Sequence, residues 1–473
     1  MKKKIVILFA ILFLLTGCRS HNKKLILATE AGFAPYEYYD GGEIVGVDID
    51  IAREIADELD MELEIKDVAF DSIINEVKTG KSDLGAAGIS HTEERAREVD
   101  YTIDYMKSRQ VLIVHKGSRI LSPKQLKTEK IAVQLGSVAD SYLTENVPSV
   151  SLVREKKFLA AIQDLKDGKV DGVVMDEVPA RELVDDRFVI LEEALVTDHY
   201  GMIVEKGNTE LLNQVNTVIK KLQDEGKIDE FLLNHMGVKT QETSHNTLRD
   251  KIYYTIIYDG RYHYIIDGFI HTIAIALGAV VVGVLLGSAA AIVQNIYDNT
   301  KKLRILYSLS RLYVTVIRGT PSILQLMIIY YVIFKATSIN IILVGIMAFG
   351  INSGAYVAEI IRAGINSVDK GQMEAGYALG LHYSQIMRYI VIPEAIKNIL
   401  PALGNEFITL VKETSVGAYI GIIELTKASD IIASRTYDYF FPLILIAGIY
   451  LMITLFLSRI FRMLERRLNH VRD

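Results

Sequence analysis

Residues 374–393 read EAGYALGLHYSQIMRYIVIP, a polar stretch that contains glycine and lies between long apolar segments. The uncharged runs around it are 268–297, 319–334, 336–358 and 439–458. A hydrocarbon core of roughly 30 Å needs about 20 apolar residues, so these runs can cross a membrane. The run 319–334 is short, and its crossing is expected to include residues before Arg318. A fifth run, 393–411, contains Lys397 and Glu406 and is expected to face protein or water rather than lipid. The second half of the chain is therefore predicted to be an all-α polytopic membrane domain with about five transmembrane helices.

Basic residues predict the orientation of this membrane domain. Those that follow the first run are Lys301, Lys302 and Arg304, and those that follow the last are Arg462, Arg466 and Arg467. Lysine and arginine are enriched in cytoplasmic loops, so both groups are expected inside the cell. Five crossings from an external start then place the C-terminus and residues 374–393 on the cytoplasmic side.

The spacing within 374–393 resembles a known element. Glu374, Ala375 and Gly376 are followed after three residues by Gly380, and after nine more by the run from Ile390 to Pro393. This pattern is similar to the EAA loop of ABC importer permeases, with glycine in place of one alanine. The resemblance implies that the first four of these residues belong to two short helices outside the bilayer, which couple to a cytoplasmic ATPase. Pro393 would start the next crossing.

The residues before about 262 have the frequent charges of a soluble domain. KLILAT (24–29) is short and apolar, as strands are, whereas VDIDIAREIADELDMEL (47–63) has apolar residues near helical spacing. Alternation of such segments through 24–238 predicts a three-layer α/β domain with mostly parallel sheets, long enough for two lobes. The mixed polarity of 239–262 predicts a linker to the membrane domain, 263–473.

The sequence excludes several kinds of chemistry. Gly80, Lys81 and Ser82 do not complete a P-loop, because Asn75 stands where that loop requires glycine. There is no dinucleotide fingerprint, no metal-site spacing of histidine and glutamate, and no nucleophile elbow, so no catalytic site, metal or cofactor is expected in this chain. A net charge of −6 indicates no nucleic-acid partner.

Two other segments carry groups suited to a zwitterion. In SDLGAAGISHTEERA (82–96) a helix is expected to begin near Ser90 to Thr92, and its free amide groups and Arg95 could grip a carboxylate. Asp176 ends an apolar strand, where it could hold an ammonium group. If these two charges lie on opposite lobes, a ligand that carries both favours closure. Singly, each has a plainer interpretation, as a surface arginine and as a helix cap.

Together these segments resemble the amino-acid-binding proteins of bacterial ABC importers, over essentially all of residues 24–238. The matching elements are Ala28-Thr29-Glu30, Phe33, Pro35-Tyr36-Glu37-Tyr38, Gly46-Val47-Asp48-Ile49-Asp50 and Ser90-x-Thr92-x-x-Arg95. The resemblance implies a two-lobed type II periplasmic-binding-protein fold with a free amino acid as its ligand.

The same resemblance implies the ligand-binding residues. They are Glu30, Phe33, Phe70, Gly88, Ser90, Arg95, Gln134, Ser137 and Asp176. Arg95 and the amide groups near Ser90 would hold the α-carboxylate, and Gly88 and Asp176 would hold the α-ammonium group. The two phenylalanines would stack on the ligand, and Glu30 would meet its side chain.

The second lobe departs from the family at one position. Its turn from Gln134 to Ser137 matches, but Val138 stands where a hydroxyl or glycine commonly helps to bind the carboxylate, which weakens the case for Ser137. Glu30 near the ligand side chain, with Gln134 rather than lysine in the second lobe, favours arginine, lysine, histidine or glutamine over glutamate or aspartate.

The N-terminus predicts export. A basic start is followed by apolar residues 5–15, the pattern of a signal peptide over residues 1–17. The sequence Leu15-Thr16-Gly17-Cys18 resembles the bacterial lipobox, which implies lipidation of Cys18; the other interpretation is a buried cysteine. It is the one cysteine of the chain, so no internal disulfide can form.

These features predict a fused substrate-binding protein and permease of an amino-acid ABC importer of the polar amino acid type. ATP and Mg would be used by a separate cytoplasmic ATPase dimer, and the permease would form a homodimer or a heterodimer with a related permease. The alternative is an amino-acid-gated channel of the glutamate-receptor type. In such receptors the pore helices interrupt the binding domain, whereas here the binding domain precedes the first crossing and no TVGYG-like filter is present.

Overall fold

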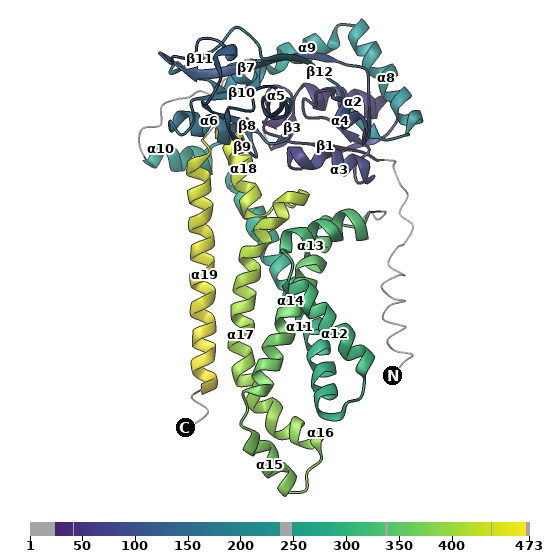
Figure 1. Ribbon diagram of the computed structural model, residues 1–473, viewed down its shortest axis with the longest axis vertical. Coiled ribbons are helices and arrows are strands. Elements are labelled where there is room, and N and C mark those ends of the chain that lie inside the picture. Colours follow the sequence, from purple (N-terminus) through teal and green to yellow (C-terminus); the bar gives the residue numbers. More distant parts are fainter. Residues whose placement is uncertain (1–23, 41, 237–247, 336–338, 437, 470–473) are drawn as a thin grey trace.

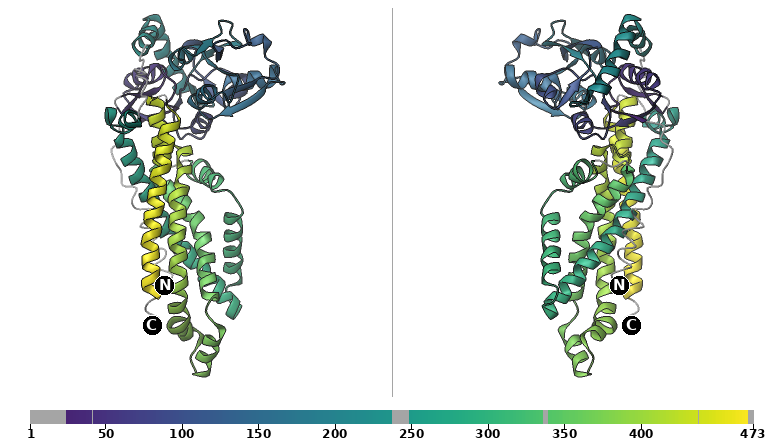
Figure 2. Two further views of the ribbon diagram at one scale, coloured as in Figure 1. Left: turned by 90° about the vertical axis from the view of Figure 1, so that its left-hand side faces the viewer. Right: turned by 90° about the vertical axis from the view of Figure 1, so that its right-hand side faces the viewer.

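The computed structural model describes residues 24–40, 42–236, 248–335, 339–436 and 438–469. The expected signal peptide 1–17 and Cys18 lie outside these ranges. So do residues 237–247, which include the beginning of the expected linker. An α/β domain rests on one end of an elongated helical domain (Figure 1). The two side views show the same arrangement (Figure 2).

The first lobe of the α/β domain contains a five-stranded sheet in the order β4-β1-β5-β13-β6. Its strands are β1 (Lys24–Thr29), β4 (Glu62–Asp67), β5 (Leu84–Gly85), β6 (Val99–Tyr101) and β13 (Ile203–Glu205). Its helices are α2 (Val47–Glu58), α3 (Ile73–Lys78), α4 (Glu93–Ala96), α8 (Thr209–Asp224) and α9 (Lys227–His235). Leu25 and Leu27 of β1 are buried, as are Ile49 and Ile55 of α2, which confirms the strand and the helix predicted for these segments.

The second lobe contains a sheet in the order β11-β7-β10-β8-β9, with β12 also paired to β7. Its strands are β7 (Met106–His115), β8 (Lys130–Gln134), β9 (Ser151–Glu155), β10 (Gly172–Asp176), β11 (Phe188–Ile190) and β12 (Val196–Tyr200). Its helices are α5 (Val138–Asn146), α6 (Phe158–Lys166) and α7 (Glu177–Leu183). The chain passes between the lobes twice, from β6 to β7 and from β12 to β13.

Both sheets are mixed, so the expectation of mostly parallel sheets is wrong. β1 runs parallel to β4 and β5, and β8 runs parallel to β9 and β10. β7 and β13 run antiparallel to all their partners. Each is the first strand after a passage between the lobes, so it enters its sheet from the cleft, where the parallel strands end.

The helical domain contains the long apolar helices predicted for the second half of the chain. Its main helices are α11 (Tyr262–Thr300), α12 (Arg304–Arg318), α13 (Ser322–Ile328), α14 (Ile341–Asn366), α17 (Ile392–Glu413), α18 (Leu425–Thr436) and α19 (Phe440–Asn469). Among the described residues, α11, α14 and α19 are long and apolar enough to cross a membrane, and α12 with 322–333 adds a fourth span if that bent pair counts as one. The charged helix α17 packs beside α14 and α19 (Figure 1).

The crossing expected at 319–334 is wrong in its bounds. The chain turns by 112° between α12 and the helix at 322–333. Gly319 ends α12, and Pro321, which has no backbone N–H, precedes the next helix. α12 therefore lies along the bundle. Its hydropathy does not indicate this, because its three arginines lower it.

Glycines allow close contact between α11 and α14. A Cβ atom on Gly287 would lie 2.7 Å from the carbonyl oxygen of Gly354, and one on Gly283 would lie 3.0 Å from Ser353 Oγ. Gly283 and Gly287 therefore let the two helices pack closely. The same Ser353 Oγ atom donates to Glu406 of α17 at 2.7 Å, so Glu406 faces protein as expected.

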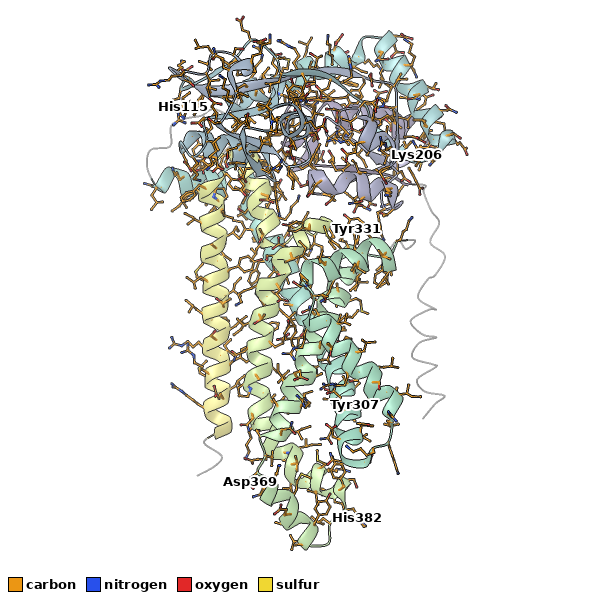
Figure 3. The ribbon with its side chains drawn as sticks, in the orientation of Figure 1. His115, Lys206, Tyr307, Tyr331, Asp369 and His382 are labelled. Atoms are coloured by element: carbon orange, nitrogen blue, oxygen red, sulfur yellow. The ribbon has the colours of Figure 1, made fainter. Side chains whose placement is uncertain are left out.

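The EAA-like segment lies at the end of the bundle farthest from the α/β domain. It forms α15 (Lys370–Ala378) and α16 (Tyr383–Ile386), which project there (Figures 1 and 2). Asp369 and His382 mark this end in Figure 3, whereas Tyr331 lies at the end that faces the α/β domain. The prediction of two short helices is confirmed.

Replacing Gly287 by alanine should destabilise the helical domain, because its Cβ atom would meet the backbone of α14. Overpacking of this kind lowers the free energy of unfolding by about 1–3 kcal/mol, so we expect a melting temperature lower by about 2–10 °C in detergent, measured by circular dichroism. Gly448→Ala in α19 is the matched control, since no atom lies within 4 Å of its Cβ position. Equal melting temperatures for the two variants would contradict the packing role.

Candidate functional site

A small cavity lies between the two lobes of the α/β domain. Its lining residues are Glu30, Phe33, Glu37, Phe70, Ala87, Gly88, Ser90, Arg95, Gln110, Gln134, Ser137, Val138, Phe158 and Asp176. Every residue that the sequence analysis assigned to the ligand belongs to this set. The structure therefore brings them together around one site, and their individual contacts with a ligand stay predictions.

Arg95 links the lobes across this cavity. Its backbone N–H donates to Thr92 Oγ1, the N-cap of α4. Its guanidinium donates to the carbonyl oxygen of Ser90 at 3.0 Å in the first lobe and to that of Gly136 at 2.7 Å in the second. The Phe70 ring centre lies 5.5 Å from the guanidinium carbon. A guanidinium held in this way has a fixed orientation, which suits a planar carboxylate better than a surface arginine does.

Asp176 lies on the other lobe, at the end of β10. Its Oδ1 atom accepts hydrogen bonds from Ser108 Oγ at 2.5 Å, from Gln110 Nε2 at 2.7 Å and from Tyr200 Oη. Asp176 is the N-cap residue of α7, as its plainer interpretation expected, but its side chain makes no capping bond there. A buried carboxylate fixed at a cleft is a suitable partner for an ammonium group.

Aromatic rings form a wall of the cavity across the lobe boundary. Phe33 of the first lobe stacks on Phe158 of the second, with ring centres 5.3 Å apart and ring planes at 22°. Phe33 also stacks on Tyr36, at 5.7 Å and 29°. The sequence analysis missed Phe158, because an apolar residue at the start of a helix carries no sign of a binding role.

Gly88 lets the backbone approach the cavity closely. Its φ of 54° is in the left-handed region, and a Cβ atom there would lie 2.9 Å from Phe33 Cε1. Its N–H donates to Asp48 Oδ2 at 3.0 Å, and Tyr105 Oη donates to Asp48 Oδ1 at 2.7 Å. Asp48, which belongs to the 46–50 element of the sequence, thus fixes the orientation of the Gly88 backbone.

The EAA-like segment packs against itself at Gly376 and is exposed at its tip. Gly376 is buried, and a Cβ atom there would lie 2.8 Å from Ile386 Cγ1. Gly380 breaks the segment between α15 and α16 with a φ of 76°. Glu374 and Ala375 are exposed, so they are free to contact another protein.

Family comparisons match both halves of the chain. The family described as bacterial extracellular solute-binding proteins, family 3, matches residues 25–238, and the family described as binding-protein-dependent transport system inner membrane component matches residues 265–470. The chain belongs to both families. It is a fused binding-protein and permease subunit of a polar amino acid ABC importer.

Named relatives agree with this assignment. The glutamine transport system permease protein GlnP of Rickettsia bellii is 38% identical over 217 residues, which are 46% of this chain and 97% of that protein. The arginine transport system permease protein ArtQ of Bacillus subtilis is 37% identical over 208 residues, which are 44% of this chain and 93% of that protein. Among solved structures, the amino acid ABC transporter substrate-binding protein AbpA of Streptococcus pneumoniae bound to L-arginine is 32% identical, with a TM-score of 0.43, over 45% of this chain and 94% of that one.

The importer subunit therefore takes part in the uptake of a polar amino acid across the cytoplasmic membrane. The first half is its extracellular binding domain and the second half its permease domain. None of these comparisons supports the channel alternative. Within the described residues, no group of three or more histidine, cysteine, aspartate and glutamate side chains could hold a metal ion.

The second-lobe turn of the binding domain uses its polar groups internally. Ser137 caps α5 and accepts a hydrogen bond from the Asp140 N–H at 3.2 Å. Gln134 Nε2 donates to the carbonyl oxygen of Lys156 at 3.0 Å. These bonds make the turn rigid. The hydroxyl of Ser137 already has a partner within the turn, which agrees with the weaker case for Ser137 as a ligand that Val138 indicated.

A lysine that the sequence analysis missed contacts Glu30, one of the residues that line the cavity. Lys157 Nζ, from the loop before α6, lies 3.5 Å from Glu30 Oε1. The sequence analysis argued that no lysine of the second lobe opposes Glu30, because Gln134 stands at the family position. The position of Lys157 shows that this argument is incomplete. No motif marks Lys157, since only the closure of one lobe on the other brings it to Glu30.

Burial raises the pKa values of the carboxylates around the cavity. It raises the pKa of Glu30 to about 6 against the opposing effect of Lys157, and that of Asp48 to about 6 against its hydrogen bonds. Burial and the neighbouring Asp198 raise the pKa of Asp176 to about 6. Burial and Asp48 raise the pKa of Glu37 well above its usual range.

The affinity of the importer for its amino acid should fall as the pH drops below about 6. Protonation of Asp176 removes the charge that holds the ammonium group, and one group with a pKa of about 6 raises the dissociation constant by about tenfold between pH 7 and pH 5. Calorimetry of the full chain at both pH values measures this change, with return to pH 7 as the control for irreversible loss. An affinity that is constant over this range would contradict the role of Asp176.

Proposed function

We propose that the chain imports a cationic amino acid or glutamine. The supporting observation is an excess of buried carboxylates over cations around the cavity: Glu30, Asp48, Asp176 and Asp198 compared with Arg95 and Lys157. A zwitterion leaves this excess unchanged, because its own charges cancel. A positive ligand side chain reduces the excess, whereas a negative one adds to it and would bring an unpaired charge into a buried site.

The relatives named as glutamine and arginine transport proteins support the same substrates. Glutamine suits the cavity because its neutral amide can donate to Glu30 without adding negative charge. Lys157 already pairs with Glu30. The preference of the cavity for a positive ligand side chain therefore depends on how much of the Glu30 charge Lys157 neutralises.

The permease domain would cross the membrane five times, with α11, α12, α14, α17 and α19 as the crossings and the C-terminus in the cytoplasm. The basic residues after the first and the last crossing support this orientation. α15 and α16 would then lie in the cytoplasm, since they occupy the end of the bundle opposite the extracellular binding domain. The signal peptide 1–17 and lipidation of Cys18 stay predictions.

A separate ATPase dimer, using ATP and Mg, would bind the exposed tip of α15 and α16. The side chains of Tyr377, Leu379 and Tyr389 are exposed in this segment and could contact such a partner. Two permease copies would surround the pathway, as a homodimer or as a heterodimer with a related permease.

Calorimetry of the full chain with single amino acids tests the proposed substrates. Arginine, lysine, histidine or glutamine should bind, and glutamate should bind at least about thirtyfold more weakly, because its carboxylate would face Glu30. Asp176→Asn should raise the dissociation constant at least about thirtyfold, since it leaves the ligand ammonium unpaired. Asp186→Asn, an exposed carboxylate of the same lobe, is the matched control and should change nothing. Tightest binding to glutamate would contradict the charge argument.

Glu374→Gln tests the coupling role of the projecting helices. We expect the ATPase activity that substrate stimulates in the assembled importer to fall at least about tenfold, with amino-acid affinity unchanged, because Glu374 lies at the opposite end from the cavity. Glu465→Gln, an exposed carboxylate near the C-terminal end of α19, is the control. Normal stimulation in the Glu374 variant would show that this residue does not couple the ATPase.

A further inference from the structure

The binding domain and the permease domain meet through a buried ion pair. Lys427 of α18 lies 2.8 Å from Asp67 of the first lobe, and their side chains are 3% and 6% exposed. Asp67 also accepts a hydrogen bond from Tyr39 Oη at 2.9 Å. Beside this pair, Tyr39 and Ala31 pack against Ile431 of α18. α18 is therefore held against the binding domain close to the cavity.

Lys157 connects this boundary to the cavity. Its Nζ atom lies 3.5 Å from Glu30 Oε1, at the cavity, and 3.6 Å from Asp430 Oδ2, on α18. Burial lowers the pKa of Lys157, but Asp430, Glu30 and Asp67 outweigh burial and raise that pKa above its usual range, so Lys157 is charged. One buried cation is shared between a carboxylate of the cavity and a carboxylate of the permease.

We propose that Asp430 of the permease domain increases the preference of the cavity for cationic over neutral amino acids, and that it acts through Lys157. Asp430 is a positioning residue, because it contacts Lys157 and not the ligand. By drawing the Lys157 ammonium towards α18, it leaves part of the negative charge of Glu30 available to the ligand side chain. This inference rests on the proposed function, in which that side chain lies near Glu30.

The charges at the boundary support this direction. The described ion pairs here join three carboxylates and two lysines: Glu30, Asp67, Asp430, Lys157 and Lys427. The group has one net negative charge with Asp430 and none without it. A unit charge on the order of 10 Å from a ligand cation, at an effective dielectric constant of about 20, changes affinity by roughly fifteenfold.

Arginine and citrulline separate this charge effect from a structural one, because citrulline is the neutral analogue of arginine with nearly the same shape. Calorimetry of the full chain in lipid nanodiscs gives both dissociation constants. For Asp430→Asn we expect the preference for arginine over citrulline to fall at least about fivefold, with citrulline affinity unchanged. Asp430→Glu, which keeps the charge, should restore most of the preference.

Lys81→Gln is the matched control. Lys81 also joins the two domains, by donating to the carbonyl oxygen of Phe334, but this contact does not involve α18. It should leave the preference for arginine unchanged even if it loosens the boundary. An unchanged preference in Asp430→Asn would overturn the inference, and so would an equal loss of affinity for both ligands, which would show a structural role alone.

The same experiment distinguishes failure of the inference from failure of the proposed function. If the unaltered chain binds arginine and only the effect of Asp430 is absent, the substrate proposal stands and the inference falls. If the unaltered chain binds none of arginine, lysine, histidine and glutamine, the substrate proposal falls, and the inference falls with it.

Discussion

Buried negative charge between the two lobes is the constraint on which the binding domain depends. Carboxylates that burial keeps from water need cations or hydrogen-bond donors, and the chain supplies them from both sides of the cleft. Asp176 takes its donors from Ser108, Gln110 and Tyr200, whereas Glu30 takes a lysine from the opposite lobe. Closure, selection of an amino acid and contact with the permease all follow from how these charges are satisfied.

The gathering of the candidate ligand residues at one cavity could be predicted from the sequence because they lie in continuous motifs. Glu30, Gly88 and Arg95 each belong to a short element that carries its own spacing, and the structure places all of them at one cavity. Lys157 and Phe158 could not be found in this way, because they reach the cavity only when the lobes close. The charge argument for the substrate was incomplete for the same reason.

In the membrane half, too, features that depend on local sequence could be predicted, whereas features that depend on the spatial path of the chain could not. The environment of the glutamate of α17 was predicted correctly, because a charged residue in an apolar helix has few possible roles. The bounds of the second crossing were wrong, since hydropathy does not detect the bend that follows Gly319. The mixed sheets were missed because strand direction depends on where the chain re-enters each lobe.

The binding cavity lies at one end of the molecule and the projecting helices α15 and α16 lie at the other, and the long helices of the bundle join the two ends. α18 contacts the binding domain, so its movement would change the partners of Lys157 and thus the hold on a bound cation. The most direct test of this account is a cryo-electron microscopy structure of the full chain with bound arginine. The account predicts the α-carboxylate at the Arg95 guanidinium, the α-ammonium group at Asp176 and the guanidinium of the ligand facing Glu30. A ligand bound in the reverse orientation, or outside the cleft between the lobes, would contradict it.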